Sequence, residues 1–191
     1  MSTLELKELS HPAGEVIKIA AGKTLDLKSQ GSVTMPTGSV LQVVQSVQTN
    51  YQSFSLNNTW ADVSGLTVAL TPSSTSNKVL VSFNLMIGTG GAGPYPRVKL
   101  LKNGADLIVG NSGIGNRVSV TGAFGAETNA SDARTVAFEY LDSPSTTSET
   151  TYKLQVSGYD SRVFYTNITG GSDSNSGMTC VSTITAMEIQ G

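Results

Sequence analysis

The stretch Lys78-Val-Leu-Val-Ser-Phe-Asn-Leu-Met-Ile87 is rich in β-branched, aromatic and aliphatic residues. Residues of these types pack well on the pleated surface of a sheet and favour strands over helices. Similar stretches occur on both sides of it, and Gly, Ser, Asn and Pro fill the segments between them. Helical periodicity is nearly absent from the chain. The sequence therefore predicts an all-β fold.

About ten strands are expected between residues 40 and 191, at the short spacing that is typical of a β-sandwich. The predicted strands are residues 40–47, 51–56, 66–70, 78–87, 97–101, 106–109, 117–123, 134–140, 152–156, 163–167 and 179–189. Asn103-Gly104 between two of them is the strongest short hairpin signal. Without helices to cover a sheet, two sheets must cover each other or one sheet must close on itself. The long loops and many strands favour the first alternative and predict a jelly-roll β-sandwich head over residues 40–191.

Residues 15–39 have a different pattern, in which short alternating strands are separated by glycine turns. So few residues cannot bury enough surface to fold alone. The simplest remedy is an intertwined β-stalk of identical chains. Its inter-chain packing residues would be Ile17, Ile19, Leu25, Leu27 and Val33. The alternative is a hairpin arm that folds back on the same chain.

The composition excludes several classes of protein. Only 14% of residues are charged, and 12 Lys and Arg face 14 Asp and Glu, so the basic surface of a nucleic-acid-binding protein is not expected. No apolar run is long enough for membrane insertion. A single histidine, His11, and a single cysteine, Cys180, leave little for catalysis and no internal disulfide. The first residues do not resemble a secretory signal, so assembly in a cytoplasm is expected.

Two motifs suggest ligand sites, but simpler interpretations are favoured. Gly88-Thr-Gly-Gly-Ala-Gly93 matches a dinucleotide-binding pattern, but Pro94-Tyr95-Pro96 and a strand follow it where a helix is required. Asp173-Ser-Asn-Ser-Gly177 resembles the start of a calcium loop without its closing glutamate. The sequence contains many Asp and Glu residues but favours no two of them as the pair of carboxylates that glycoside hydrolysis needs. We therefore expect no catalytic residue, no cofactor and no metal, and a protein that is not an enzyme.

The run Gly158-Tyr-Asp-Ser-Arg-Val-Phe-Tyr-Thr-Asn167 is the best candidate for a contact with a receptor. Aromatic rings stack on the apolar face of a sugar, and polar side chains bind its hydroxyl groups. The candidate receptor-contact residues are Tyr159, Asp160, Arg162, Tyr165 and Asn167. The alternative is a strand whose aromatic residues fill the core or a trimer seam, with Arg162 in an inter-chain ion pair.

Three segments of the chain resemble parts of phage fibre proteins. Residues 17–27 (IKIAAGKTLDL) and 31–44 (GSVTMPTGSVLQVV) resemble the shaft-to-head junction of fibres from tailed bacteriophages, notably those of cyanobacteria. Residues 182–189 (STITAMEI) resemble the closing strand of their trimeric heads, which are similar to the tumour-necrosis-factor-like jelly roll.

The resemblance implies a homotrimeric tail or neck fibre, or a short spike, on the exterior of the virion. Residues 1–14 would anchor it to another virion protein of the tail, neck or capsid, with Leu4, Leu6 and Leu9 as the apolar contacts. The head would adhere multivalently to a glycan or protein of the host surface. The alternatives are a head-decoration or collar protein without receptor binding and a cellular lectin-like carbohydrate-binding module.

Overall fold

The computed structural model describes residues 21–23, 33, 35–90, 93–125, 133–169 and 177–191. The chain divides into two units, Met1–Met35 and Pro36–Gly191. The predicted anchor residues and all predicted stalk residues except Val33 lie outside the described residues: Leu4, Leu6, Leu9, Ile17, Ile19, Leu25 and Leu27. Val33 is described and is exposed in the single chain. In the described part of the chain no helix is long and apolar enough to cross a membrane.

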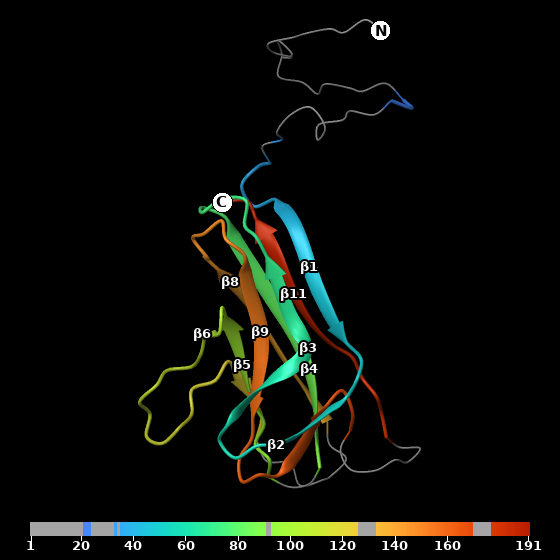
Figure 1. Ribbon diagram of the computed structural model, residues 1–191, viewed down its shortest axis with the longest axis vertical. Helices are drawn as coiled ribbons and strands as arrows, with labels where there is room; N and C mark the ends of the chain where they lie inside the picture. The colour runs from blue at the N-terminus through green and yellow to red at the C-terminus, as the bar shows by residue number, and fades with distance from the viewer. Residues whose placement is uncertain (1–20, 24–32, 34, 91–92, 126–132, 170–176) are drawn as a thin grey trace, which may run out of the picture. The chain divides into compact units, whose positions relative to one another are not determined.

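The second unit is a sandwich of two antiparallel sheets, and we call it the sandwich (Figure 1). The first sheet, called the β1 sheet, contains β1 (Val40–Gln48), β11 (Ser182–Ile189), β4 (Lys78–Thr89), β10 (Val163–Thr166), β2 (Gln52–Ser55) and β8 (Ala133–Asp142). The second, called the β3 sheet, contains β3 (Trp60–Leu70), β9 (Thr150–Ser157), β5 (Arg97–Lys102), β6 (Ala105–Ile108) and β7 (Gly122–Ala123).

The strand order is that of a jelly roll. In the β1 sheet, β1 lies beside the last strand β11, which pairs with β4, and β4 pairs with β8 on its other side. The β3 sheet has the order β3, β9, β5 and β6. The chain passes repeatedly from one sheet to the other, between β2 and β3, β3 and β4, β4 and β5, β7 and β8, β8 and β9, and β9 and β10, as it does when two Greek keys form a double sheet. The predicted all-β sandwich is confirmed.

The core lies between the sheets and follows the alternation of each strand. On β4 the odd-numbered residues from Val79 to Ile87 face inward and are buried, and on β9 Tyr152, Leu154 and Val156 do the same. Each large aliphatic side chain buried in this way contributes about 1.5–3 kcal/mol to folding. The alternation of side chains between the two faces of each strand therefore selects the residues of the core.

The turn at Asn103-Gly104 confirms the predicted hairpin between β5 and β6. Both residues have positive φ, 50° for Asn103 and 84° for Gly104, as a two-residue hairpin turn requires. The predicted strand 117–123 is wrong, because only Gly122–Ala123 pairs with β5. Upstream of it, Gly113 and Gly115 have positive φ and Ile114 and Val118 are exposed, so no neighbouring strand covers this segment.

The two ends of the sandwich differ in character. At one end the chain enters and leaves: Gly38 N donates to Gln190 O at 2.8 Å, and Gln190 N donates to Ser39 O at 2.9 Å. From this end β4 runs along the full length of the sheet to Thr89. The loops after β2, β4 and β9 lie at the opposite end, which we call the far end (Figure 1).

A polar cluster fastens the two sheets to each other. Tyr152 of β9 is fully buried, and its hydroxyl donates to Asp142 Oδ2 of β8 at 2.7 Å. Lys102 Nζ of β5 lies 2.9 Å from Asp142 Oδ1. Burial and the Asp142 carboxylate together raise the pKa of Tyr152 above its usual value, so the hydroxyl remains a donor.

Replacing Asp142 with alanine is expected to lower the free energy of unfolding by about 2 kcal/mol, because the Tyr152 hydroxyl loses its acceptor inside the protein. The matched control is Asp106→Ala, which breaks an ion pair with Lys99 on the outer surface and should cost less than about 1 kcal/mol. Urea unfolding of both variants measures the difference. Equal costs for the two variants would contradict the assigned role of Asp142.

Candidate functional site

Three loops at the far end of the sandwich are hydrogen-bonded to one another. They are the β2–β3 loop (residues 56–59), the β4–β5 loop (residues 90–96, of which 90 and 93–96 are described) and the β9–β10 loop (residues 158–162). Tyr159 N donates to Pro94 O at 2.8 Å, and Asn58 N donates to Gly158 O at 2.9 Å. These main-chain bonds hold the β9–β10 loop between the other two.

Side chains and close packing hold the β9–β10 loop further. Asn57 Oδ1 accepts from Asp160 N at 3.3 Å, and Ser55 Oγ donates to Ser161 O at 2.7 Å. A Cβ atom at Gly158 would lie 2.9 Å from the Phe164 ring and 3.0 Å from a main-chain oxygen, so only glycine fits where this loop begins. These contacts restrain the conformation of the loop.

Tyr95 is the most unusual residue of the far end. Its φ is 44°, in the left-handed region that bulky residues rarely adopt and that costs roughly 1–2 kcal/mol. Pro94 and Pro96 on either side are buried, whereas Tyr95 itself is 44% exposed. Its ring packs edge-on against the ring of Tyr159, with centroids 5.9 Å apart and an interplanar angle of 86°. The two rings form an exposed corner from two loops, called the tyrosine corner below.

Charged groups border the tyrosine corner. Asp160 and Ser161 both have positive φ, which turns the β9–β10 loop sharply. Arg162 Nε lies 3.6 Å from Asp160 Oδ2, and both side chains are more than half exposed. The position of a Cβ on Gly93 would be 3.3 Å from Arg162 Nη1, so the Arg162 side chain lies along the backbone of the β4–β5 loop beside Pro94. The guanidinium and the carboxylate thus sit together at the surface.

Of the five predicted receptor-contact residues, the structure brings three together. Tyr159, Asp160 and Arg162 share the β9–β10 loop and are exposed. Tyr165 pairs with Gly88 in the β1 sheet, and its ring lies 3.2 Å from the Cβ position of Gly90, so it is half-buried.

Asn167 is fully buried and is not available to a ligand in this fold. Its Nδ2 atom donates to Gln48 O at 2.8 Å and to Asn50 O at 3.0 Å, while its Oδ1 atom accepts from the Ser182 hydroxyl at 2.5 Å. The side chain therefore joins β10 to β11 and to the end of β1. The sequence prediction grouped Asn167 with the β9–β10 loop because the two are close in the chain. Asn167 lies instead after β10, the strand that follows this loop.

The sequence prediction did not include Tyr95. The Pro94-Tyr95-Pro96 triplet was interpreted only as evidence against a nucleotide-binding helix. A signal was nevertheless available, because prolines on both sides of a residue are typical of a loop, and candidate contact residues are sought on loops. The partner ring of Tyr159 is far away in the sequence, and no pattern along the chain connects the two.

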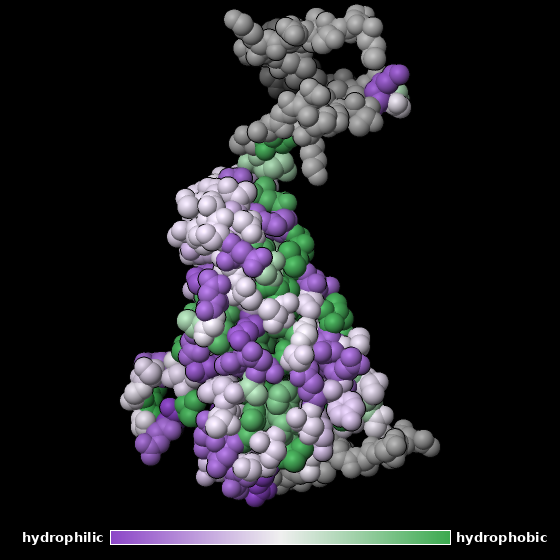
Figure 2. All heavy atoms as spheres, in the orientation of Figure 1, coloured by the Kyte–Doolittle hydropathy of each residue, from purple (hydrophilic) through white to green (hydrophobic). Residues whose placement is uncertain are grey.

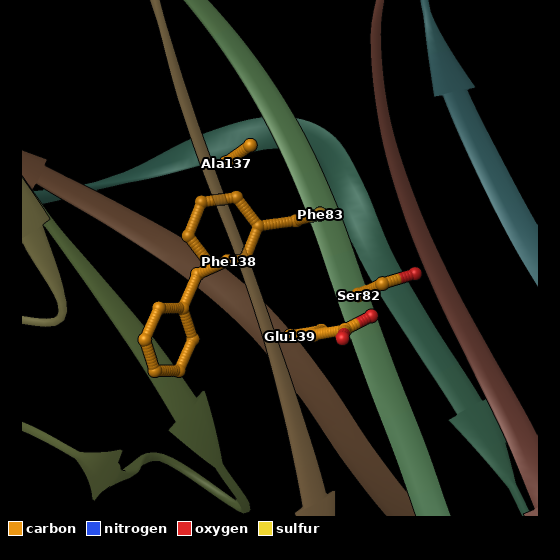
Figure 3. A pocket seen from close by; sticks show the side chains of 5 residues that line it. All are labelled: Ser82, Phe83, Ala137, Phe138 and Glu139. Atoms are coloured by element: carbon orange, nitrogen blue, oxygen red, sulfur yellow. The ribbon is translucent and has the colours of Figure 1, made fainter.

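A second surface feature is an open depression at β4 and β8, lined by Ser82, Phe83, Ala137, Phe138 and Glu139 (Figure 3). Phe83 and Phe138 point to one side of the sheet, whereas Ser82 and Glu139 point to the other (Figure 3). Phe83 is buried and Phe138 is partly exposed at the edge. One carboxylate and two rings do not assemble a catalytic arrangement, so the tyrosine corner is the stronger site.

The described residues offer no metal site, since no group of three or more His, Cys, Asp or Glu side chains comes together among them. The carboxylates of the β3 sheet instead pair with neighbouring groups. Asp62 accepts from Lys153 Nζ and Gln155 Nε2, both at 2.7 Å, and these bonds hold the pKa of Asp62 below its usual value. These pairs stabilise the solvent-facing side of the sheet and carry no chemistry of their own.

Comparison with known proteins gives no functional assignment. No protein-family profile matches the sequence, and no curated protein matches it. The VP2 subviral particle of infectious bursal disease virus is similar over 87% of this chain and 45% of its own, with 11% identity and a TM-score of 0.45. The match to the T13 viral particle of the same virus (IBDV) covers 88% of this chain and 40% of the matched chain, with 12% identity and a TM-score of 0.46.

Another similar structure is the dimeric latent PorU of Porphyromonas gingivalis. The match covers 85% of this chain but only 14% of the PorU chain, with 11% identity and a TM-score of 0.44. The chain thus spans less than half the length of each of these proteins. At such low identity and TM-score no conclusion about function follows.

Proposed function

We propose that the chain is a structural virion protein, a non-enzymatic fibre or spike subunit that attaches the particle to the host cell surface. The polarity of the sandwich is the observation that carries the proposal. The chain enters and leaves at one end, where Gly38 and Gln190 are hydrogen-bonded, and the tyrosine corner is displayed at the other. An adhesin needs this arrangement, because its attachment and its contact surface must not interfere. The resemblance of residues 17–27 and 31–44 to fibre junctions supports the same function.

The proposed appendage is a homotrimer, and the outer face of the β1 sheet supports self-association. Val43, Met187, Leu80 and Leu141 lie in register across β1, β11, β4 and β8, and we call them the apolar row. Val43 is 56% exposed and Leu141 is 52% exposed in the single chain. Large exposed apolar groups that are contiguous mark association surfaces.

The outer face of the β3 sheet is chemically different. It carries paired charges, Asp62 with Lys153 and Lys99 with Asp106, and the Lys99 ammonium lies 4.7 Å from the Trp60 ring centroid. Such groups are well placed in water and costly to bury. The hydrophilic and neutral groups that dominate the visible surface also suit water, and hydrophobic groups are scattered among them (Figure 2). The contrast favours the β1 sheet as the face that meets a second copy.

A trimer has a direct consequence for adhesion. Each copy of the sandwich would present one tyrosine corner, and a site this open binds weakly by itself. Three sites held together, on several appendages per particle, raise the effective affinity by about 10²–10⁴-fold without any new contact. The proposed mechanism is therefore multivalent attachment and needs no tight individual site.

The virion assignment is tested on virus particles purified from cultures in which the gene for the chain is expressed. Antibody against the full chain should label the outside of purified particles, and excess purified chain should reduce their adsorption to host cells. A head-decoration or collar protein would be labelled but would not compete. A cellular lectin would label no particle, and that result would contradict the proposal.

A further inference from the structure

We infer that the tyrosine corner formed by Tyr95 and Tyr159, with Asp160 and Arg162 at its border, is a binding site for a neutral hexopyranose. This inference rests on the proposed adhesive function and specifies its ligand. It also changes the composition of the predicted contact surface. Tyr95 of the β4–β5 loop joins the site, whereas the buried Asn167 and the half-buried Tyr165 do not belong to it.

The conformation of Tyr95 indicates a role outside the core. A large side chain in the left-handed region is strained, and the strain persists only where surrounding structure imposes it. Two buried prolines flank Tyr95 and anchor the segment, and the Tyr95 ring gains little by packing because it remains 44% exposed. Since the fold does not need this ring outside, presentation to a ligand is the simplest account of its position.

The corner is ready to bind without rearrangement. Main-chain bonds from Tyr159 to Pro94 and from Asn58 to Gly158 hold the two tyrosine-bearing segments together. The two rings already meet edge to face, with an interplanar angle of 86°. Little side-chain entropy is then lost on binding, and this matters for a site whose contacts are few.

The shape and chemistry of the corner fit a pyranose ring. One tyrosine ring offers a flat apolar face for the C–H groups of the sugar, and the perpendicular ring limits the sugar on its side. The Asp160 carboxylate can accept from two hydroxyl groups, and the Arg162 guanidinium can donate to sugar oxygens. Because these two charges lie together, 3.6 Å apart, the site has little net charge and favours a neutral sugar over an acidic one.

The test uses the full chain and saturation-transfer NMR with the methyl glycosides of glucose, galactose, mannose and N-acetylglucosamine, each at about 10 mM, a concentration that detects millimolar binding. At least one glycoside should bind. Tyr95→Asn removes the ring while keeping a residue that tolerates positive φ, and Tyr159→Ser removes the second ring. Each should weaken binding about fivefold or more, whereas Tyr95→Phe should retain most of it.

The matched control is Tyr51→Ser, which removes an exposed tyrosine from the β1–β2 loop and should leave binding unchanged. Thermal unfolding of every variant establishes that the sandwich remains folded. Binding by none of the glycosides, or binding that survives the loss of both rings, overturns the inference. The proposed adhesion has its own readout: competition for particle adsorption that persists without any glycoside binding leaves adhesion standing and refutes only the sugar site.

Discussion

Replacing Glu188 with alanine is expected to lower the free energy of unfolding by about 3 kcal/mol or more, because several buried donors lose one shared acceptor. Glu188 is only 1% exposed. Its Oε1 atom accepts from Ser73 N and from Asn77 Nδ2, both at 2.6 Å, and its Oε2 atom accepts from Gln42 Nε2 at 2.6 Å. All of these donors are uncharged groups, so neutral hydrogen-bond donors stabilise the buried carboxylate.

The position of Glu188 makes this network important for the whole sandwich. The carboxylate lies near the end of β11 and joins it to β1 and to the β3–β4 connection. Asn77, one of the donors, also accepts from the main-chain nitrogen of Gly191 at 3.1 Å. Loss of the carboxylate should therefore loosen the end at which the chain enters and leaves, while the tyrosine corner at the far end remains formed.

Glu188 also predicts how stability depends on pH. Burial acts to raise the pKa of Glu188, but hydrogen bonds from Asn77, Gln42 and Ser73 outweigh it and hold the pKa below its usual value. The unfolded state therefore binds more protons than the folded state between the two pKa values. The stabilisation is fully present above the unfolded pKa, near 4.5, and is lost as the pH falls through the folded pKa.

Denaturant unfolding at neutral pH and at about pH 3 measures both effects, since the lower value lies below the ordinary glutamate pKa. Wild type should lose more stability on acidification than Glu188→Gln, which has no carboxylate to protonate. Glu149→Ala, at an exposed position before β9, is the matched control and should unfold like wild type. An unchanged midpoint for Glu188→Ala would show that the donors find other partners.

Much of the fold was accessible from the sequence because it depends on local patterns. The β-branched, aromatic and aliphatic composition of residues 78–87 predicted the strand β4, and Asn103-Gly104 predicted the hairpin between β5 and β6. The network around Glu188 was not accessible, since Asn77 lies far from it along the chain. The alternation of β11 places the Glu188 carboxylate on the buried face of the strand. Only its hydrogen-bond partners, which come from distant parts of the chain, explain why a carboxylate lies there.

The candidate site was predictable only in part, for a similar reason. The composition of residues 158–162 identified one half of the tyrosine corner, because Tyr, Asp and Arg in a loop suit recognition. Tyr95, the other half, comes from the β4–β5 loop, and its place depends on the hydrogen bond between Tyr159 and Pro94. Asn167 is the opposite case, a residue wrongly included in the site. Because it is close in sequence to the β9–β10 loop it was expected to be exposed, but it is buried in the fold.

Introducing two carboxylates into the apolar row, with Val43→Glu and Leu141→Glu in one chain, is expected to convert the proposed trimer into a monomer. Each substitution would place an unpaired charge in a subunit interface, at a cost of several kcal/mol per charge, and the trimer repeats this cost in every copy. Both side chains are more than half exposed in the single chain, so the core of the sandwich should remain intact.

Light scattering after size exclusion at low micromolar concentration measures the outcome. Wild type should have three times the chain mass of 19.9 kDa, and the double variant should have the mass of one chain. Thr67→Glu is the matched control, because it adds a carboxylate to the outer face of the β3 sheet, opposite Lys153, and should leave the trimer unchanged. A wild-type monomer, or an assembly that survives the double substitution, would contradict the proposed interface.

The same double variant separates the single site from its multivalent use. The apolar row and the tyrosine corner involve different residues, so a monomer should bind a glycoside as wild type does. It should nevertheless compete for particle adsorption about 10²-fold less well or worse, because only linked sites gain from effective concentration. Equal competition by monomer and trimer would mean that one tight site suffices, and the open tyrosine corner would then be too weak to be that site.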